Sequence, residues 1–92
     1  MSEALAATVE VPNRLGLHAR AAAKLVDLAN RYESDIEVSK DGQAADAKSI
    51  MGVLLLCGQQ GAKITFHASG PDAETALAAL CVLVADGFGE EQ

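Results

Sequence analysis

Aromatic and basic residues are scarce in this sequence. The chain has no tryptophan, and aromatic residues make up 3% of its 92 residues, so we expect no platform for stacking nucleic-acid bases. Seven Lys and Arg residues stand against 13 Asp and Glu residues, which gives a formal net charge of −6. Contacts to phosphate backbones require a surplus of positive side chains, so this balance argues against general nucleic-acid binding.

Cysteines and long apolar runs are also few. Cys57 and Cys81 form neither a disulfide framework nor a C-x-x-C pair, and because both lie in apolar runs we expect them to be small core residues. No apolar run approaches the roughly 20 residues of a membrane span, so no membrane insertion is expected. Residues 1–4 lack the basic start and apolar stretch of a signal peptide. We therefore expect a cytoplasmic protein.

Hydrophobic residues, in contrast, make up 50% of the chain. This fraction argues against disorder, and 92 residues form a single domain, 1–92, with no room for a second core. Alternating apolar residues predict strands over about 4–12, 34–39, 43–47 and 64–68. Apolar stripes at helical spacing predict helices over about 19–32 and 49–57, and a last helix that begins near Pro71 and ends at Gly87.

The resulting order, β-α-β-β-α-β-α, predicts an α+β two-layer sandwich. One sheet covered on one face by helices is the simplest solution for a chain of this length. Asp41-Gly42 signals a hairpin, so at least part of the sheet should be antiparallel.

The most informative segment surrounds His18, at the junction between a loop and the first helix. Unpaired N–H groups and the positive end of the helix dipole stabilise an anion there and disfavour a protonated imidazole, so His18 is expected to be neutral and nucleophilic. Arg20, in the first turn, can hold two phosphate oxygens, and Gly16 allows a tight loop. These parts suit a histidine that accepts a phosphoryl group.

A histidine at a helix start is common, however, and usually takes part in no chemistry. No second histidine lies nearby in the sequence, and no carboxylate is spaced as a metal partner, so we expect no metal at His18. His67, on the last predicted strand, should lie on the face opposite Ile64 and Phe66, and we assign it no role.

Two motifs resemble those of one family. Leu15-Gly16-Leu17-His18-Ala19-Arg20 resembles the active-site motif of HPr, the histidine-containing phosphocarrier of the bacterial phosphoenolpyruvate-dependent phosphotransferase system. Lys48-Ser49-Ile50-Met51-Gly52-Val53 resembles the regulatory-serine segment of the same family, and the similarity covers about residues 5–88. It implies an open-faced sandwich with a four-stranded antiparallel sheet and three helices on one face.

The resemblance implies a relay without a cofactor. Enzyme I, charged by phosphoenolpyruvate, would pass its phosphoryl group to Nδ1 of His18, Arg20 would steady the phosphate, and a IIA-type acceptor would receive it. The protein would be a carrier and not a turnover enzyme, and we expect it to be a monomer. Many members have proline after that arginine, where this chain has Ala21. Alanine should preserve the helix, and it leaves both the sugar-uptake and the nitrogen-related branch open.

Ser49 has two interpretations. It is a natural N-cap for the helix that follows. The resemblance adds a second role, because some family members are phosphorylated on this serine by an HPr kinase/phosphorylase. A phosphoserine at a helix N-terminus is electrostatically tolerated, but it would add a charge of about −2 beside a docking surface.

The helix after Ser49 has two apolar stripes. Val53, Leu56 and Cys57 suit the core, whereas Ile50, Met51 and Leu54 lie on an adjacent face. A domain this small cannot easily bury both, so the second stripe should be exposed and bind partners, which in the family are enzyme I and the acceptors. We expect basic residues around this patch: Arg14, Arg20, Lys24 and Lys48.

Two other functions remain open at this point. The chain could be a small ligand-sensing regulatory α/β sandwich domain, which would not need His18 and Arg20 at a helix start. It could also be a regulator that binds partners through the Ile50, Met51 and Leu54 stripe without carrying phosphate.

Overall fold

The computed structural model describes residues 4–90. The expectation that the chain begins without a signal peptide concerns residues 1–3, which lie outside this range. The elements along the chain are β1 (Leu5–Glu10), α1 (Ala19–Ala29), β2 (Asp35–Lys40), β3 (Gln43–Asp46), α2 (Ile50–Leu55), β4 (Lys63–Ser69), α3 (Ala73–Ala85) and a short 3-10 helix, η1 (Gly87–Gly89).

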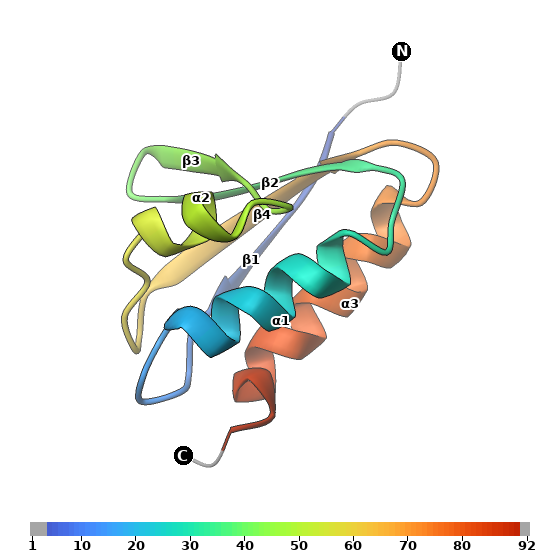
Figure 1. Cartoon of the computed structure of the whole chain (residues 1–92). Helices are drawn as coiled ribbons and strands as arrows, with labels where there is room; N and C mark the ends of the chain where they lie inside the picture. The colour runs from blue at the N-terminus through green and yellow to red at the C-terminus, as the bar shows by residue number, and fades with distance from the viewer. Residues whose placement is uncertain (1–3, 91–92) are drawn as a thin grey trace.

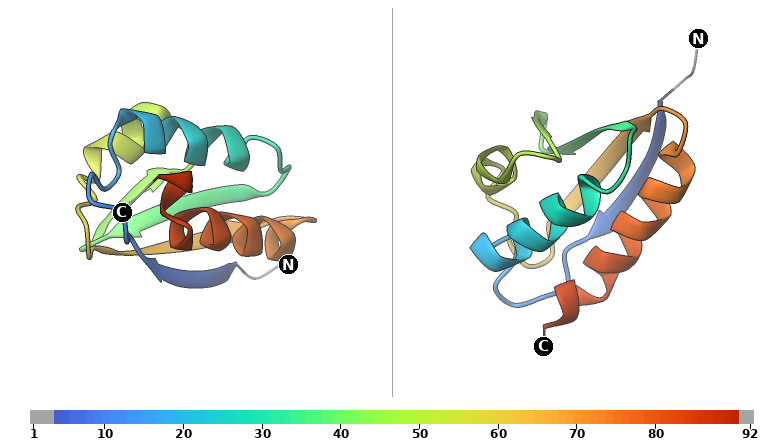
Figure 2. Two further views of the ribbon diagram at one scale, coloured as in Figure 1. Left: turned by 90° about the horizontal axis from the view of Figure 1, so that it is seen from below. Right: turned by 45° about the vertical axis from the view of Figure 1, so that its right-hand side comes forward.

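The four strands form one antiparallel sheet in the order β1-β4-β2-β3. β4 pairs with β1 and β2, and β2 pairs with β3 in a hairpin. The three helices cover one face of this sheet: α3 packs on β1 and β4, and α1 packs against α2 and α3 (Figures 1 and 2). The predicted two-layer sandwich is therefore confirmed.

Alternation of apolar and polar residues fixes the sheet's two faces. Ile64, Phe66 and Ala68 of β4 are buried under the helices, while His67 between them points to the uncovered face, as predicted. Burial of each large apolar side chain stabilises the fold by about 1.5–3 kcal/mol. The hairpin also follows the sequence, because Asp41 and Gly42 both have positive φ values (50° and 81°), as a two-residue type I′ turn requires.

Helix α1 is shorter than the predicted 19–32. Its C-cap is Asn30, whose side-chain amide donates to the Val26 carbonyl at 2.9 Å. The next two N–H groups, of Arg31 and Tyr32, bond to carbonyls only three residues back. This tightening closes the helix in place of another α-helical turn.

The expectation that Cys57 is a core residue is wrong. Helix α2 ends at Leu55 with buried Leu56 as its C-cap, and Cys57 then adopts a left-handed backbone with φ 53°. This conformation reverses the chain at a helix end, and it leaves the Cys57 side chain exposed. Cys81 is half-buried against the core, closer to expectation.

The last helix follows its predicted stripe. Ala73, Leu77, Leu80 and Val84 are all buried, and Gly87 follows the helix with φ 67°. Its N-cap, Asp72, makes no side-chain bond to its own helix.

Candidate functional site

His18 begins helix α1 as its N-cap. Its backbone is extended (φ −73°, ψ 176°), and its Nδ1 accepts a hydrogen bond from the backbone N–H of Arg20 at 3.3 Å. A Ser, Thr, Asp or Asn oxygen usually fills this place. Nδ1 can accept this bond only with its lone pair, so it carries no proton. In the neutral ring the proton is therefore assigned to Nε2. The nucleophilic nitrogen thus faces the positive end of the helix.

The loop before His18 is fixed against the loop that precedes β4. The Leu17 N–H donates to the Gly58 carbonyl at 2.7 Å, and the Leu17 side chain is buried. Gly16 has φ 64°, and a Cβ there would lie 2.3 Å from the Gly58 carbonyl oxygen. Only glycine therefore allows this close approach.

The other side of the His18 ring contacts a residue that the sequence analysis did not single out. Nε2 is hydrogen-bonded to Oε2 of Glu90, and Oε1 of Glu90 accepts a bond from Nδ2 of Asn13 at 2.8 Å. Asn13 is fully buried and also donates to the Gly16 carbonyl at 2.9 Å. The chain thus brings together groups 72 residues apart, and no motif around Glu90 marks it.

The C-terminal segment is shaped to bring Glu90 to His18. Gly87, Phe88 and Gly89 all have positive φ values, and the Phe88 side chain is buried. The ammonium group of Lys24 donates to the Phe88 carbonyl at 2.7 Å. Figure 1 shows this end of the chain beside the start of α1. Lys24, expected in a docking surface, instead secures this segment.

The charge around Glu90 favours its carboxylate form. The hydrogen bond from Asn13 lowers the pKa of Glu90 below its usual value, partial burial opposes this, and the hydrogen bond from His18 and the charge of Lys24 add to the lowering. The carboxylate is therefore ionised at neutral pH.

A polar hollow of about 580 Å³ lies next to Glu90. Its lining includes Arg14, Leu15, Arg20 and Lys24. Within residues 4–90, neither the Arg14 nor the Arg20 guanidinium takes part in an ion pair. Both are exposed and free to bind an anion that approaches His18.

The chain is similar to proteins of one known family. A family model described as "PTS HPr component phosphorylation site" matches residues 5–86. The chain belongs to the HPr family. It is 49% identical over 78 residues to phosphocarrier protein HPr of Cupriavidus necator, and the aligned region covers 85% of this chain and 88% of that protein. It is 40% identical over 85 residues to phosphocarrier protein NPr of Escherichia coli, with 91% and 94% covered.

Solved structures agree with this family assignment. The crystal structure of HPr-C-His from Thermoanaerobacter tengcongensis matches with a TM-score of 0.92 at 43% identity, over 96% of this chain and 99% of that one. As a member of the HPr family, the protein is a phosphocarrier of the phosphotransferase system and not a turnover enzyme. A ligand-sensing domain and a regulator without phosphotransfer are not favoured.

Ser49 is the N-cap of α2. Its backbone is extended (φ −117°, ψ 116°), and its Oγ accepts a hydrogen bond from the Gly52 N–H at 3.2 Å. The hydroxyl is half-buried. Because the Lys48 carbonyl contacts Asn30 at the end of α1, Ser49 and His18 lie toward opposite ends of the α1–α2 pair.

The exposed apolar residues of α2 differ from the predicted stripe. Ile50 is 44% exposed and Met51 68%, but Leu54 is half-buried against the core, and Leu55 is exposed instead (71%). Leu15, in the His18 loop, is 72% exposed and lines a hollow with His18 and Cys57, the residue two positions after Leu55. We call Leu15, Ile50, Met51 and Leu55 the apolar patch.

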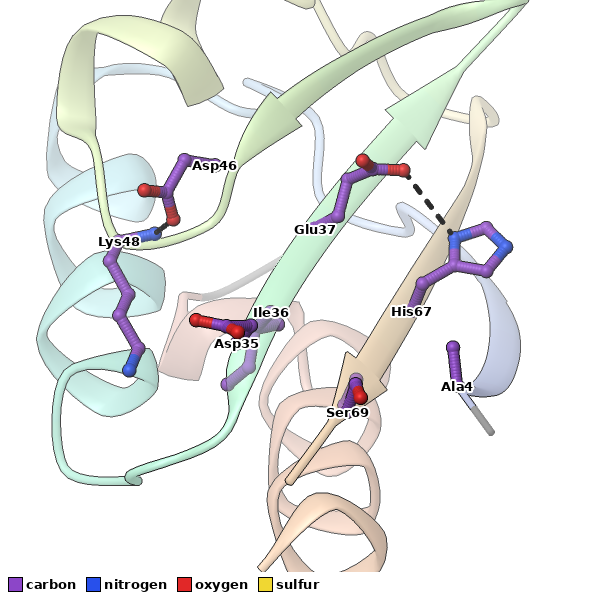
Figure 3. A pocket seen from close by; sticks show the side chains of 9 residues that line it. Ala4, Asp35, Ile36, Glu37, Asp46, Lys48, His67 and Ser69 are labelled. Atoms are coloured by element: carbon purple, nitrogen blue, oxygen red, sulfur yellow. Dashed lines mark hydrogen bonds and ion pairs between the residues drawn. The ribbon is translucent and has the colours of Figure 1, made fainter. Parts of the chain in front are cut away.

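Lys48 does not point toward the apolar patch. Its ammonium group donates to the Tyr32 carbonyl at 2.8 Å, and its stem lines a hollow of about 540 Å³ at the uncovered face of the sheet. Figure 3 shows this hollow, where Nδ1 of His67 lies 3.9 Å from Oε1 of Glu37. Of the four basic residues predicted to surround the patch, only Arg14 and Arg20 keep free charged groups near it.

Residues 4–90 contain neither a metal-binding cluster nor a membrane-spanning helix. No three His, Cys, Asp or Glu side chains of this range are arranged to hold a metal ion. None of its helices combines the length and apolar character that crossing a membrane requires.

Proposed function

We propose that His18 carries the phosphoryl group of this phosphocarrier on Nδ1, receiving it from phospho-enzyme I and passing it to a IIA-type acceptor. The N-cap geometry of His18 supports this proposal most directly. It presents an unprotonated Nδ1 at the positive end of a helix, with the free guanidinium of Arg20 in the first turn.

The transfer step needs no cofactor. The Nδ1 lone pair forms a bond to phosphorus while the bond between phosphorus and its donor atom on enzyme I breaks. The Arg20 N–H then donates to a phosphoryl oxygen in place of Nδ1, and the Arg20 guanidinium binds the remaining oxygens. Transfer to the acceptor runs through the same contacts in reverse.

The test is labelling with enzyme I and radiolabelled phosphoenolpyruvate. We expect the parent protein to take up an acid-labile label and His18→Ala to take up none. His67→Ala is the matched control, because His67 is the second histidine and lies on the uncovered face of the sheet; it should label normally. Equal labelling of His18→Ala and the parent would overturn the proposal.

We also propose that the apolar patch, with Arg14 at its edge, docks enzyme I and the acceptors. The support is the exposure of its four apolar side chains and the hollow that Leu15 lines together with His18 and Cys57. Leu55→Glu should raise the KM for this protein as a substrate of enzyme I with little loss of stability. Leu54→Glu should instead lower the melting temperature, because Leu54 packs on the core. Equal effects of both substitutions on KM would contradict this assignment.

We also propose that the protein acts in the cytoplasm and as a monomer.

We further propose that Ser49 is a site for a regulatory phosphate, added by an enzyme such as an HPr kinase/phosphorylase. The support for Ser49 is its place at the start of α2, directly before the exposed Ile50 and Met51. Incubation with such a kinase and ATP, compared with Ser49→Ala, tests it.

A further inference from the structure

We propose that Glu90 is a positioning residue for the phosphotransfer reaction, fixing the proton of His18 on Nε2 and balancing the charge that the ring gains when Nδ1 attacks phosphorus. The inference rests on the function proposed for His18. Its basis is the chain of contacts from buried Asn13 to Glu90 and from Glu90 to the His18 ring.

The geometry constrains the ring at both nitrogens. The Arg20 N–H approaches Nδ1, and the Glu90 carboxylate accepts from Nε2. With a donor on one side and an acceptor on the other, only one neutral tautomer satisfies both partners. Without Glu90, no other group within residues 4–90 would accept a hydrogen bond from Nε2–H, and the group would be left to solvent. The ring could then rotate or exchange its proton between the two nitrogens.

Glu90 is itself held on several sides. Asn13 donates to its second oxygen at 2.8 Å, and the amide of Asn13 cannot be reversed because its other contact, the Gly16 carbonyl, is also an acceptor. Lys24 secures the preceding residue through the Phe88 carbonyl. The Glu90 side chain is only 16% exposed. A carboxylate placed this firmly can orient its partner, as the buried aspartate of a Ser-His-Asp triad orients its histidine.

The charge balance gives the carboxylate a second role. When Nδ1 bonds to phosphorus and the donor atom on enzyme I leaves with its electron pair, the ring retains the Nε2 proton and becomes positively charged. Glu90 stabilises that charge at the ring edge opposite the incoming phosphoryl group. The charged groups that line the adjoining hollow, Arg14, Arg20 and Lys24, offset the repulsion between the carboxylate and the phosphate.

Three variants separate these roles. Glu90→Ala removes both the hydrogen bond and the charge, Glu90→Gln retains an acceptor oxygen without the charge, and Glu90→Asp retains the charge on a shorter stem. Asp86→Asn is the matched control, because Asp86 is an exposed acid in the same segment, and within residues 4–90 its side chain makes no hydrogen bond or ion pair with His18.

Two measurements are made on each variant. Nitrogen-15 NMR of the histidine rings reports the His18 tautomer without enzyme I. We expect the Nε2–H form in the parent and in Glu90→Gln, and a mixture of tautomers in Glu90→Ala. Initial rates of phosphoryl transfer from enzyme I should fall about tenfold or more in kcat for Glu90→Ala, with KM nearly unchanged. Glu90→Gln should lie between Glu90→Ala and the parent, Glu90→Asp should recover part of the rate, and Asp86→Asn should match the parent.

An unchanged tautomer together with an unchanged kcat in Glu90→Ala would overturn the inference. A rise in KM alone would also overturn it, because Glu90 would then act in docking. The NMR result does not depend on phosphotransfer. If His18 proves not to carry the phosphoryl group, a tautomer change in Glu90→Ala still shows that Glu90 positions the ring, and only the catalytic role fails.

Discussion

Helices α1 and α2 begin in the same way but present different atoms. At both starts the N-cap backbone is extended, and its side chain accepts a hydrogen bond from the first turn, at 3.3 Å for His18 and 3.2 Å for Ser49. The two starts differ in whether the capping side chain has a second hydrogen-bond partner. Within residues 4–90 the Ser49 hydroxyl has no second side-chain partner, whereas the His18 ring is bound at its far nitrogen by Glu90.

The comparison separates the contribution of a helix end from that of a reactive site. Both helix starts offer unpaired N–H groups and a positive field. Only the α1 start adds a nitrogen nucleophile, a tautomer fixed by a carboxylate, and a free guanidinium beside it. The helix end thus supplies a place for an anion, and the long-range contacts around His18 supply the chemistry.

The largest effect should follow from making the α1 start resemble that of α2. His18→Ser retains a side-chain oxygen that can cap the helix, so the free energy of unfolding should change by no more than about 1 kcal/mol. Labelling from phosphoenolpyruvate should disappear, because a serine hydroxyl is not an activated nucleophile here. Denaturant unfolding and labelling of the same preparation check both parts. A variant that unfolds would show that the imidazole is needed for structure.

A smaller effect is expected from removing the guanidinium beside His18. Arg20→Ala leaves the nucleophile in place but removes hydrogen bonds to a charged group, so transfer should slow about ten- to hundredfold. Arg31→Ala is the matched control on the same helix, because Arg31 pairs only with exposed Asp27. Initial rates at saturating enzyme I measure the effect. If the two variants retain the same rate, Arg20 is an ordinary surface charge.

Changes at the α2 start should have smaller effects on transfer. A carboxylate is a good N-cap, so Ser49→Asp should retain the helix while adding charge next to Ile50 and Met51. We expect KM to rise about three- to tenfold with kcat and circular dichroism nearly unchanged. Ser49→Ala should behave in the opposite way, losing about 1 kcal/mol of stability at unchanged KM. Superimposable rate curves for Ser49→Asp and the parent would place Ser49 outside the docking surface.

The sequence predicts those features that local pattern decides. Alternation in β4, the left-handed Asp41-Gly42 turn and the stripe of α3 depend on neighbouring residues, and the structure shows each of them as expected. The sequence also predicts His18 at the start of its helix, because loop residues and a helical apolar period meet at that point, and the structure shows it there as the N-cap.

The features that the sequence did not predict depend on distant segments. Glu90 reaches His18 only because three left-handed residues turn the chain after α3. The sequence predicts Lys24 and Lys48 around the apolar stripe of α2, but it gives no sign that their ammonium groups donate to the backbone carbonyls of Phe88 and Tyr32. In α2, six residues are too few for the apolar period to decide whether Leu54 or Leu55 faces outward.

The smallest effect concerns the third helix start, where the N-cap serves another segment. The Asp72 carboxylate accepts hydrogen bonds from the Ser34 hydroxyl at 2.5 Å and from the Ser34 and Glu33 N–H groups at 2.9 Å each, and it makes no bond to α3. These bonds, the Ser34 hydroxyl first, lower the pKa of Asp72 below its ordinary 3.8. A lowered folded-state pKa means that the carboxylate stabilises the fold above the unfolded-state value, and that this contribution is lost as the pH falls through the folded-state value.

Asp72→Asn should therefore be less stable than the parent at neutral pH. The difference should begin to shrink as the pH falls below about 4, the unfolded-state value, and shrink further as the pH falls through the lower folded-state value. Urea unfolding between pH 7 and pH 2.5 measures both curves. Glu74→Gln, which removes an exposed acid from the first turn of the same helix, is the control for loss of one negative charge. Because only one carboxyl is involved and water reaches it, the change should be small, and phosphotransfer should be unaffected. A difference between Asp72→Asn and the parent that stays constant with pH would mean that Asp72 contributes through its shape and hydrogen bonds, and not through its charge.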